Sequence, residues 1–255
     1  MRYSKSRRTP LNLDNDMVID FHTNIGQCAD TFCDPVKLLI DMDTYGVDVA
    51  VVCPTDRYLA VANTEGNNYI AESVAKSNGR FIGFGCVSPW YGEEAVREIR
   101  RIKALGLRGL KVHSFYQGFM LSDRIADPIF EECMVQSLPV LVHTGTPISA
   151  MPFQAREVAL RFPELIVVIA HMGFSDFWLD ASASADLPNT YLEYSYQMHS
   201  VISGCLEDHG AEKILFGSDW PFSHIKIEMD KAGLAKSDTD KKMILGMNAA
   251  RILGI

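Results

Sequence analysis

Eight short, continuous apolar runs alternate along this chain with segments of helical periodicity, and this alternation limits the folds that the sequence can adopt. The runs are residues 17–21, 47–53, 81–87, 109–112, 139–142, 165–170, 190–194 and 213–216. Runs of this kind are typical of strands buried on both faces, as in parallel sheets. The segments between them have helical spacing, as in 93–105, where Val96, Ile99 and Ile102 recur on one stripe.

Eight strand–helix units in about 240 residues match the size of a closed (β/α)8 TIM barrel. The rival arrangement is an open doubly wound sheet, but neither GxGxxG nor GxxxxGK[ST] follows any of the predicted strands. The sequence therefore predicts an α/β fold with a single barrel domain over residues 17–255. Residues 1–16 are predicted to be a disordered leader, because their basic cluster is not followed by the apolar run of a signal peptide.

The composition of the chain limits the classes of partner that the protein can bind. A net charge of −8 leaves no broad basic face for nucleic acid or a membrane surface. Six cysteines without a CxxC pair indicate neither a disulfide framework nor a zinc finger. We expect a cytoplasmic protein that acts on a small molecule, and its apolar helix faces leave room for a homodimer.

Five of the predicted strands run into polar side chains at their carboxyl ends. These are His22 and Asn24 at the first strand, Lys111 and His113 at the fourth, His143 at the fifth, His171 at the sixth and Asp219 at the eighth. Active sites of TIM barrels lie at this end. One buried histidine needs no function, but five matched positions favour a shared site.

The residue types indicate the chemistry. Imidazole nitrogens with one carboxylate suit zinc or another borderline divalent ion, which would lower the pKa of a bound water or polarise a carbonyl. Asp219 would accept the proton from that water. His171 would hydrogen-bond a developing oxyanion or deliver a proton.

The segments IDFHTN, LVHTGT, IAHMG, KILFGSDWPF and NAARILGI resemble the amidohydrolase-related family. This family includes aminocarboxymuconate semialdehyde decarboxylase, aromatic-acid decarboxylases and lactone hydrolases, and the resemblance runs from residue 17 to 255. It implies a barrel of the amidohydrolase type and one divalent ion, zinc or manganese. The implied metal ligands are His22, Asn24, His143 and Asp219, with His171 as the catalytic or substrate-contacting histidine.

The chain departs from the family at one position, where the usual His-x-His is His22–Thr23–Asn24. An amide oxygen is a weaker ligand than imidazole for such an ion. Three alternatives follow. Asn24 is a weak ligand and a metal is still bound; the site is metal-free and uses His143, His171 and Asp219 for acid–base work; or the barrel only binds.

Lys111 is open to two roles. Some amidohydrolases use a carbamoylated lysine on the fourth strand to bridge two metals, but one His-rich cluster favours an ammonium that holds a substrate carboxylate. Further candidates for substrate contact are His113, Arg57, Trp90 and Tyr116. Arg57 could instead be a solvated loop residue, and the aromatic side chains could be loop packing.

These features predict a hydrolase that opens a lactone or amide bond in a small carboxylate-bearing or cyclic substrate, with one divalent ion. The alternative within enzymes is a non-oxidative decarboxylase of an aromatic or muconate-type acid. The alternative of another class is a catalytically silent binding barrel.

Overall fold

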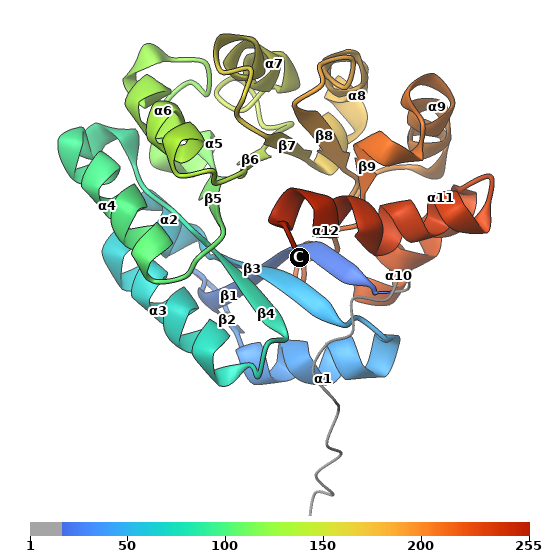
Figure 1. Cartoon of the computed structure of the whole chain (residues 1–255), viewed down its shortest axis with the longest axis horizontal. Coiled ribbons are helices and arrows are strands. Elements are labelled where there is room, and N and C mark those ends of the chain that lie inside the picture. Colours follow the sequence, from blue (N-terminus) through green and yellow to red (C-terminus); the bar gives the residue numbers. More distant parts are fainter. Residues whose placement is uncertain (1–16) are drawn as a thin grey trace, which may run out of the picture.

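The computed structural model describes residues 17–255, so the predicted leader 1–16 lies outside the described residues. Eight parallel strands follow one another around the sheet in chain order (Figure 1). They are β1 (Ile19–Gln27), β3 (Val49–Pro54), β4 (Phe81–Gly85), β5 (Gly109–Val112), β6 (Val140–His143), β7 (Val167–Ala170), β8 (Thr190–Glu193) and β9 (Ile214–Leu215). Each overlaps one of the eight predicted runs, which confirms the strand pattern, although β1 runs six residues beyond its predicted end. The sequence missed β2 (Phe32–Cys33), which pairs antiparallel with the end of β1.

Helices cover the outside of this sheet, as Figure 1 shows. The longer ones are α1 (Pro35–Tyr45), α3 (Asn63–Lys76), α4 (Glu93–Ala104), α6 (Asp127–Val135), α7 (Pro152–Arg161), α8 (Phe174–Ser184) and α9 (His199–His209). Short helices that the sequence did not predict are α2 (Asp56–Ala60), α5 (Ser114–Gln117) and α10 (Ile225–Asp230). Among residues 17–255, no helix combines the length and hydropathy that crossing a bilayer requires.

The C-terminal helical segment, residues 238–253, is a composite. It consists of α11 (Asp238–Lys242), a π-helical turn (Met243–Met247) and α12 (Asn248–Leu253). Gly246 in the turn lies against the start of β1, where an added Cβ would be 1.8 Å from the carbonyl oxygen of Met17. Ile252 and Leu253 of α12 pack into the apolar interior of the barrel. The C-terminal segment therefore closes the barrel at the amino ends of the strands.

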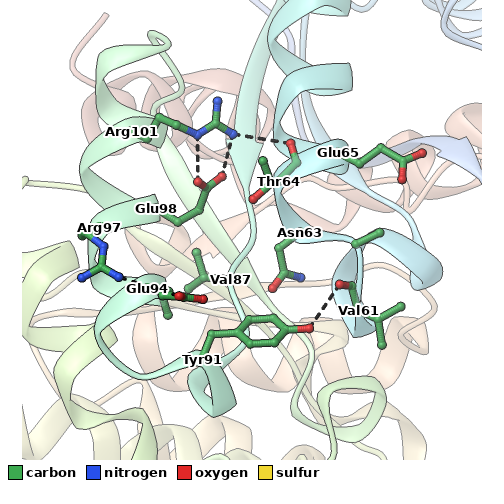
Figure 2. A pocket seen from close by; sticks show the side chains of 12 residues that line it. Val61, Asn63, Thr64, Glu65, Val87, Tyr91, Glu94, Arg97, Glu98 and Arg101 are labelled. Carbon is green, nitrogen blue, oxygen red and sulfur yellow. Dashed lines mark hydrogen bonds and ion pairs between the residues drawn. The ribbon is translucent and has the colours of Figure 1, made fainter.

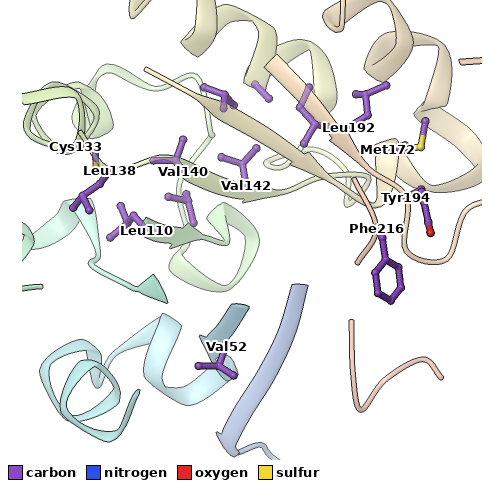
Figure 3. Close-up of a cluster of buried hydrophobic side chains, with 14 of the residues drawn as sticks. Val52, Leu110, Cys133, Leu138, Val140, Val142, Met172, Leu192, Tyr194 and Phe216 are labelled. Atoms are coloured by element: carbon purple, nitrogen blue, oxygen red, sulfur yellow. The ribbon is translucent and has the colours of Figure 1, made fainter. Parts of the chain in front are cut away.

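Alternate side chains along the strands point outward to the helices or inward to the interior of the barrel. In β6, Val140 and Val142 pack outward with the helices (Figure 3), whereas Leu141 belongs to the interior cluster. His143 follows on the same face as Leu141 and lines a cavity at the carboxyl end. Lys111 takes the equivalent inward place in β5.

β1 departs from strict alternation. Ile19 and Phe21 already face the interior, so a regular pleat would direct His22 away from it. The pairing of β1 with β3 is irregular between Asp20 and Thr23, and beyond it both His22 and Asn24 line the cavity. A β-bulge has this effect because it re-aims the side chains that follow it.

The barrel closes between β1 and the segment after β9. Backbone hydrogen bonds join Phe21 N to Phe216 O (2.9 Å), Asp219 N to His22 O (2.7 Å) and Asn24 N to Trp220 O (2.8 Å). The buried carboxylate of Asp20 reinforces this seam by accepting from Ser218 N (2.8 Å) and Ser218 Oγ (2.5 Å). It also accepts from His22 N at 3.2 Å.

We expect Ser218→Ala to lower the free energy of unfolding by ~1–3 kcal/mol, because it removes a donor from a buried charged acceptor. Urea denaturation followed by circular dichroism measures the change. The exposed Ser175, changed to Ala, is the matched control. A Ser218→Ala midpoint equal to that of the control would show that this contact does not stabilise the seam.

Candidate active site

A cavity of about 570 Å³ lies at the carboxyl ends of the strands. Eight of the ten predicted site residues line it: His22, Asn24, Lys111, His113, Tyr116, His143, His171 and Asp219. Arg57 and Trp90 are not among its lining residues. The Arg57 guanidinium pairs with Glu65 at 3.0 Å, and the indole of Trp90 is 60% exposed while its Nε1 donates to Gln117 O.

Three of these side chains converge closely enough for one metal ion. His22, His171 and Asp219 each offer a ligand atom, and the three atoms lie within 4.8 Å of one another. Two imidazoles and a carboxylate suit zinc, and manganese also accepts such a set. The predicted site for one divalent ion is therefore present, and His171 belongs to the cluster of histidines and carboxylates while His143 does not.

Glu193, at the end of β8, fixes the protonation of both histidines. Its carboxylate only accepts, so Nδ1 of His22, 2.8 Å away, must carry a proton. Ser195 Oγ donates to the same carboxylate at 2.9 Å, so it accepts from Nδ1 of His171 at 2.8 Å. In the neutral form of each ring Nε2 is then the unprotonated acceptor, as metal ligation requires.

Glu193 was not predicted as a site residue, although its position carries a faint signal in the sequence. It is the one acidic residue in the otherwise uncharged run 190–194. Its side chain is fully buried, and burial by itself raises its pKa. The hydrogen bonds from His22 and Ser195 outweigh that effect and hold the pKa of Glu193 below its usual 4.5. The carboxylate therefore stays ionised inside the barrel.

The facing atoms of His22 and Asp219 support a cation between them. Oδ1 of Asp219 is 3.2 Å from Nε2 of His22, and both atoms are acceptors when the carboxylate is ionised. Such a pair needs a proton or a cation nearby. The ammonium of Lys111 lies 2.7 Å from the same Nε2. The donor set thus fits a positively charged group at this point.

Asn24 and His143 have other partners here. Nδ2 of Asn24 donates to Asp219 Oδ1 at 2.8 Å and to Trp220 O at 3.2 Å, so the amide holds the Asp219 carboxylate. Nε2 of His143 lies 2.8 Å from Thr146 Oγ1. The assignment of these two residues as metal ligands stays a prediction.

Burial sets the charge state of the cavity. It lowers the pKa of His143 and His171 well below 6.5, with neighbouring cationic groups adding to the effect, so both rings are neutral. It also lowers the pKa of Lys111, against the attraction of nearby acidic groups. Burial raises the pKa of Asp219, although His22 and Lys111 offset part of the shift. The pKa of Lys111 and the pKa of Asp219 are thus both shifted toward neutral pH, where a group can exchange a proton.

Aromatic rings form two flat walls of the cavity. On one side His113 stacks on His143 at 3.8 Å and on Tyr116 at 4.0 Å between ring centroids. On the other, Phe174 stacks on His171 at 4.5 Å. Walls of this kind suit a planar ligand.

Backbone strain also gathers here. In the described part of the chain, seven residues other than glycine have positive φ, and four of them line the cavity: His171 (62°), Phe174 (51°), Tyr196 (63°) and Asp219 (51°). Such conformations persist only where the surrounding structure enforces them, and they cluster at functional sites. This supports a functional role for the cavity.

A second cavity, of about 550 Å³, lies between α3 and α4 (Figure 2). Its charged side chains pair with one another, as Arg101 does with Glu98 at 2.7 Å and Arg97 with Glu94 at 3.9 Å. Tyr91 donates its hydroxyl to Val61 O. It contains neither histidine nor cysteine, so the chemistry points to the first cavity.

Comparison with known proteins agrees with this geometry. The model of a family described as Amidohydrolase matches residues 28–255. The chain belongs to this amidohydrolase family. The family resemblance predicted from the sequence is thereby confirmed, although the matched range begins after His22 and Asn24.

Two relatives found by sequence are decarboxylases. The 2-amino-3-carboxymuconate-6-semialdehyde decarboxylase of Dictyostelium discoideum is 28% identical, and the match covers 74% of this chain but only 65% of that relative. The gamma-resorcylate decarboxylase of Polaromonas sp. (strain JS666) is 23% identical, over 83% of this chain and 84% of the relative.

Solved structures confirm the amidohydrolase-type barrel. The 5-carboxyvanillate decarboxylase of Sphingomonas paucimobilis superimposes with a TM-score of 0.77 at 20% identity, over 94% of this chain and 99% of that one. The dihydroxybenzoic acid decarboxylase of Polaromonas sp. JS666, solved with manganese and 2-nitroresorcinol, gives 0.75 at 18% identity over 94% and 97%.

We expect Glu193→Gln to weaken zinc or manganese binding by ~10–100-fold, the usual effect of losing a partner that orients a ligating histidine. The amide keeps the volume but presents an NH2 group to donors, so neither histidine retains its tautomer. Competition with a chromophoric chelator measures the affinity. The exposed Glu131, changed to Gln, is the control, and equal affinities in the two variants would refute the role of Glu193.

Proposed function

We propose that this protein is a metal-dependent, non-oxidative decarboxylase of a small aromatic or muconate-type acid. The observation that supports this proposal most directly is the flat-walled cavity, in which the ion-binding cluster of His22, His171 and Asp219 lies beside Lys111. The decarboxylase relatives favour this reaction, the alternative from the sequence, over the hydrolysis that we first expected.

A bound ion would supply positive charge that holds the acid and its neighbouring hydroxyl or keto oxygen. Nε2 of His22 would then be occupied by the ion, which frees the Lys111 ammonium for the substrate carboxylate. The walls of His113, Tyr116 and Phe174 would hold the ring or conjugated chain flat.

Loss of carbon dioxide breaks a carbon–carbon bond and leaves its electron pair on the substrate carbon, which must then take up a proton. Asp219 is the residue we assign to this step, because its carboxyl group lies at the cluster, 3.2 Å from Nε2 of His22, where the substrate would be held. Asn24 positions Asp219 through its 2.8 Å hydrogen bond.

The reaction is tested by loading the protein with manganese or zinc and offering carboxyl-labelled dihydroxybenzoates and muconates. We expect labelled carbon dioxide from at least one of them, and a loss of ~10²–10⁴-fold in kcat for Asp219→Asn, the range typical of a general acid. Asp176→Asn, an exposed carboxylate outside the cavity, is the control. Turnover of lactones without carbon dioxide release would replace the decarboxylase by a hydrolase.

The third ligand is tested separately. If His171 ligates the ion, His171→Ala should weaken metal binding more than the ~10–100-fold caused by losing an outer partner. His143→Ala should bind metal nearly as well as the wild type, as should the exposed control His199→Ala. The reverse order would restore His143 to the ligand set that the family resemblance implies.

A homodimer and a cytoplasmic location, both expected from the sequence, also stay predictions.

A further inference from the structure

Two of the six cysteines meet at the rim of the cavity. Cys28 follows β1, Cys33 ends β2, and the hairpin between them is closed by a hydrogen bond from Cys28 N to Thr31 O (2.8 Å). Their sulfur atoms are 3.2 Å apart. Cys53, Cys86, Cys133 and Cys205 are buried elsewhere, and no thiol pairing is seen for them in residues 17–255.

We propose that Cys28 and Cys33 form a reversible disulfide, which makes this hairpin a redox modification site. The cross-strand pairing of Gly26 with Cys33 brings both thiols to one side of the hairpin. A disulfide forms where two sulfur atoms can approach to bonding distance without backbone rearrangement, and a 3.2 Å contact leaves little movement to make.

The two thiols differ in access. Cys28 is 6% exposed and lines the cavity, so a small oxidant reaches it through the open mouth, whereas Cys33 is 1% exposed and lines a separate, smaller cavity. Burial raises the pKa of both thiols, and the hydrogen bond between them opposes that rise at Cys28 but adds to it at Cys33. Cys28 is therefore the attacking thiol and Cys33 the resolving one.

The oxidant is a low-molecular-weight disulfide, such as oxidised glutathione. Cys28 as thiolate attacks one of its sulfur atoms and releases one thiol, which leaves a mixed disulfide on Cys28. Cys33 then loses its proton and attacks Cys28 Sγ, and the second small thiol leaves. Two protein thiols are oxidised and one disulfide is reduced to two thiols, so electrons and protons balance.

The bond would fix the segment that carries Ala29, Asp30 and Thr31, three residues of the cavity wall. This inference does not depend on which reaction the site catalyses, because it can be read without substrate. A failure here therefore leaves the proposed decarboxylase untouched, and the converse also holds.

The test incubates the folded protein with oxidised glutathione, unfolds it in acid, alkylates the free thiols and measures the intact mass. We expect alkylation of the wild type to fall from six thiols to four, and dithiothreitol to restore all six. Residues 9–37 contain no internal lysine or arginine, so trypsin leaves both cysteines in one peptide. That peptide should be lighter by the mass of two hydrogen atoms.

Variants assign the roles. Cys33→Ser should accumulate glutathione on Cys28, and Cys28→Ser should acquire no disulfide. Cys205→Ser, which removes a buried cysteine far along the chain, should still lose two thiols. Six alkylated thiols in the treated wild type, or separate glutathione adducts on both cysteines, would overturn the proposal.

Discussion

The carboxylate of Asp20 is the contact on which the rest of the site depends. It lies where the first and last strands of the barrel meet, and it receives hydrogen bonds from His22 N and from both donors of Ser218. One group therefore stabilises the seam of the barrel and also the bulge that turns His22 inward. Burial raises its pKa to about 7, so the ionised carboxylate is costly here and its donors are needed.

Asp20 orders the backbone of the site, and Glu193 orders the protons on its histidines. From β8, which lies two strands from β1 across the seam, it sets the tautomer of His22 directly and that of His171 through Ser195. Nε2 of His22 then faces Asp219 and Lys111, and the ligand atoms of His22, His171 and Asp219 lie within 4.8 Å of one another. A buried charge is expensive, but it can order two rings at once because it accepts from every neighbour without competing donors of its own. The cavity is thus organised by a residue that is not among those lining it.

The sequence could predict the elements with strong periodicity and the residues at their ends. The eight strands follow from short apolar runs, and the positions of Lys111 and His143 follow from the carboxyl ends of two of these runs. Both are local patterns in the sequence. β2 has only two residues and leaves no such pattern. The bulge in β1, the role of Glu193 and the donor role of Asn24 depend on hydrogen bonds between residues far apart in the chain, which periodicity does not encode. The pairing of Arg57 with Glu65 was not predictable for the same reason, since the segment that carries Arg57 folds into α2.

The closure of the barrel by α12 determines how a ligand can enter and leave the site. Apolar side chains fill the described barrel below the cavity, and Ile252 and Leu253 seal its far end. Over residues 17–255 the cavity thus opens only at the carboxyl ends of the strands, beside the hairpin that follows β1. A ligand must therefore enter and leave the cavity through the same opening, and a bound ligand has to depart before the next one can reach the histidines.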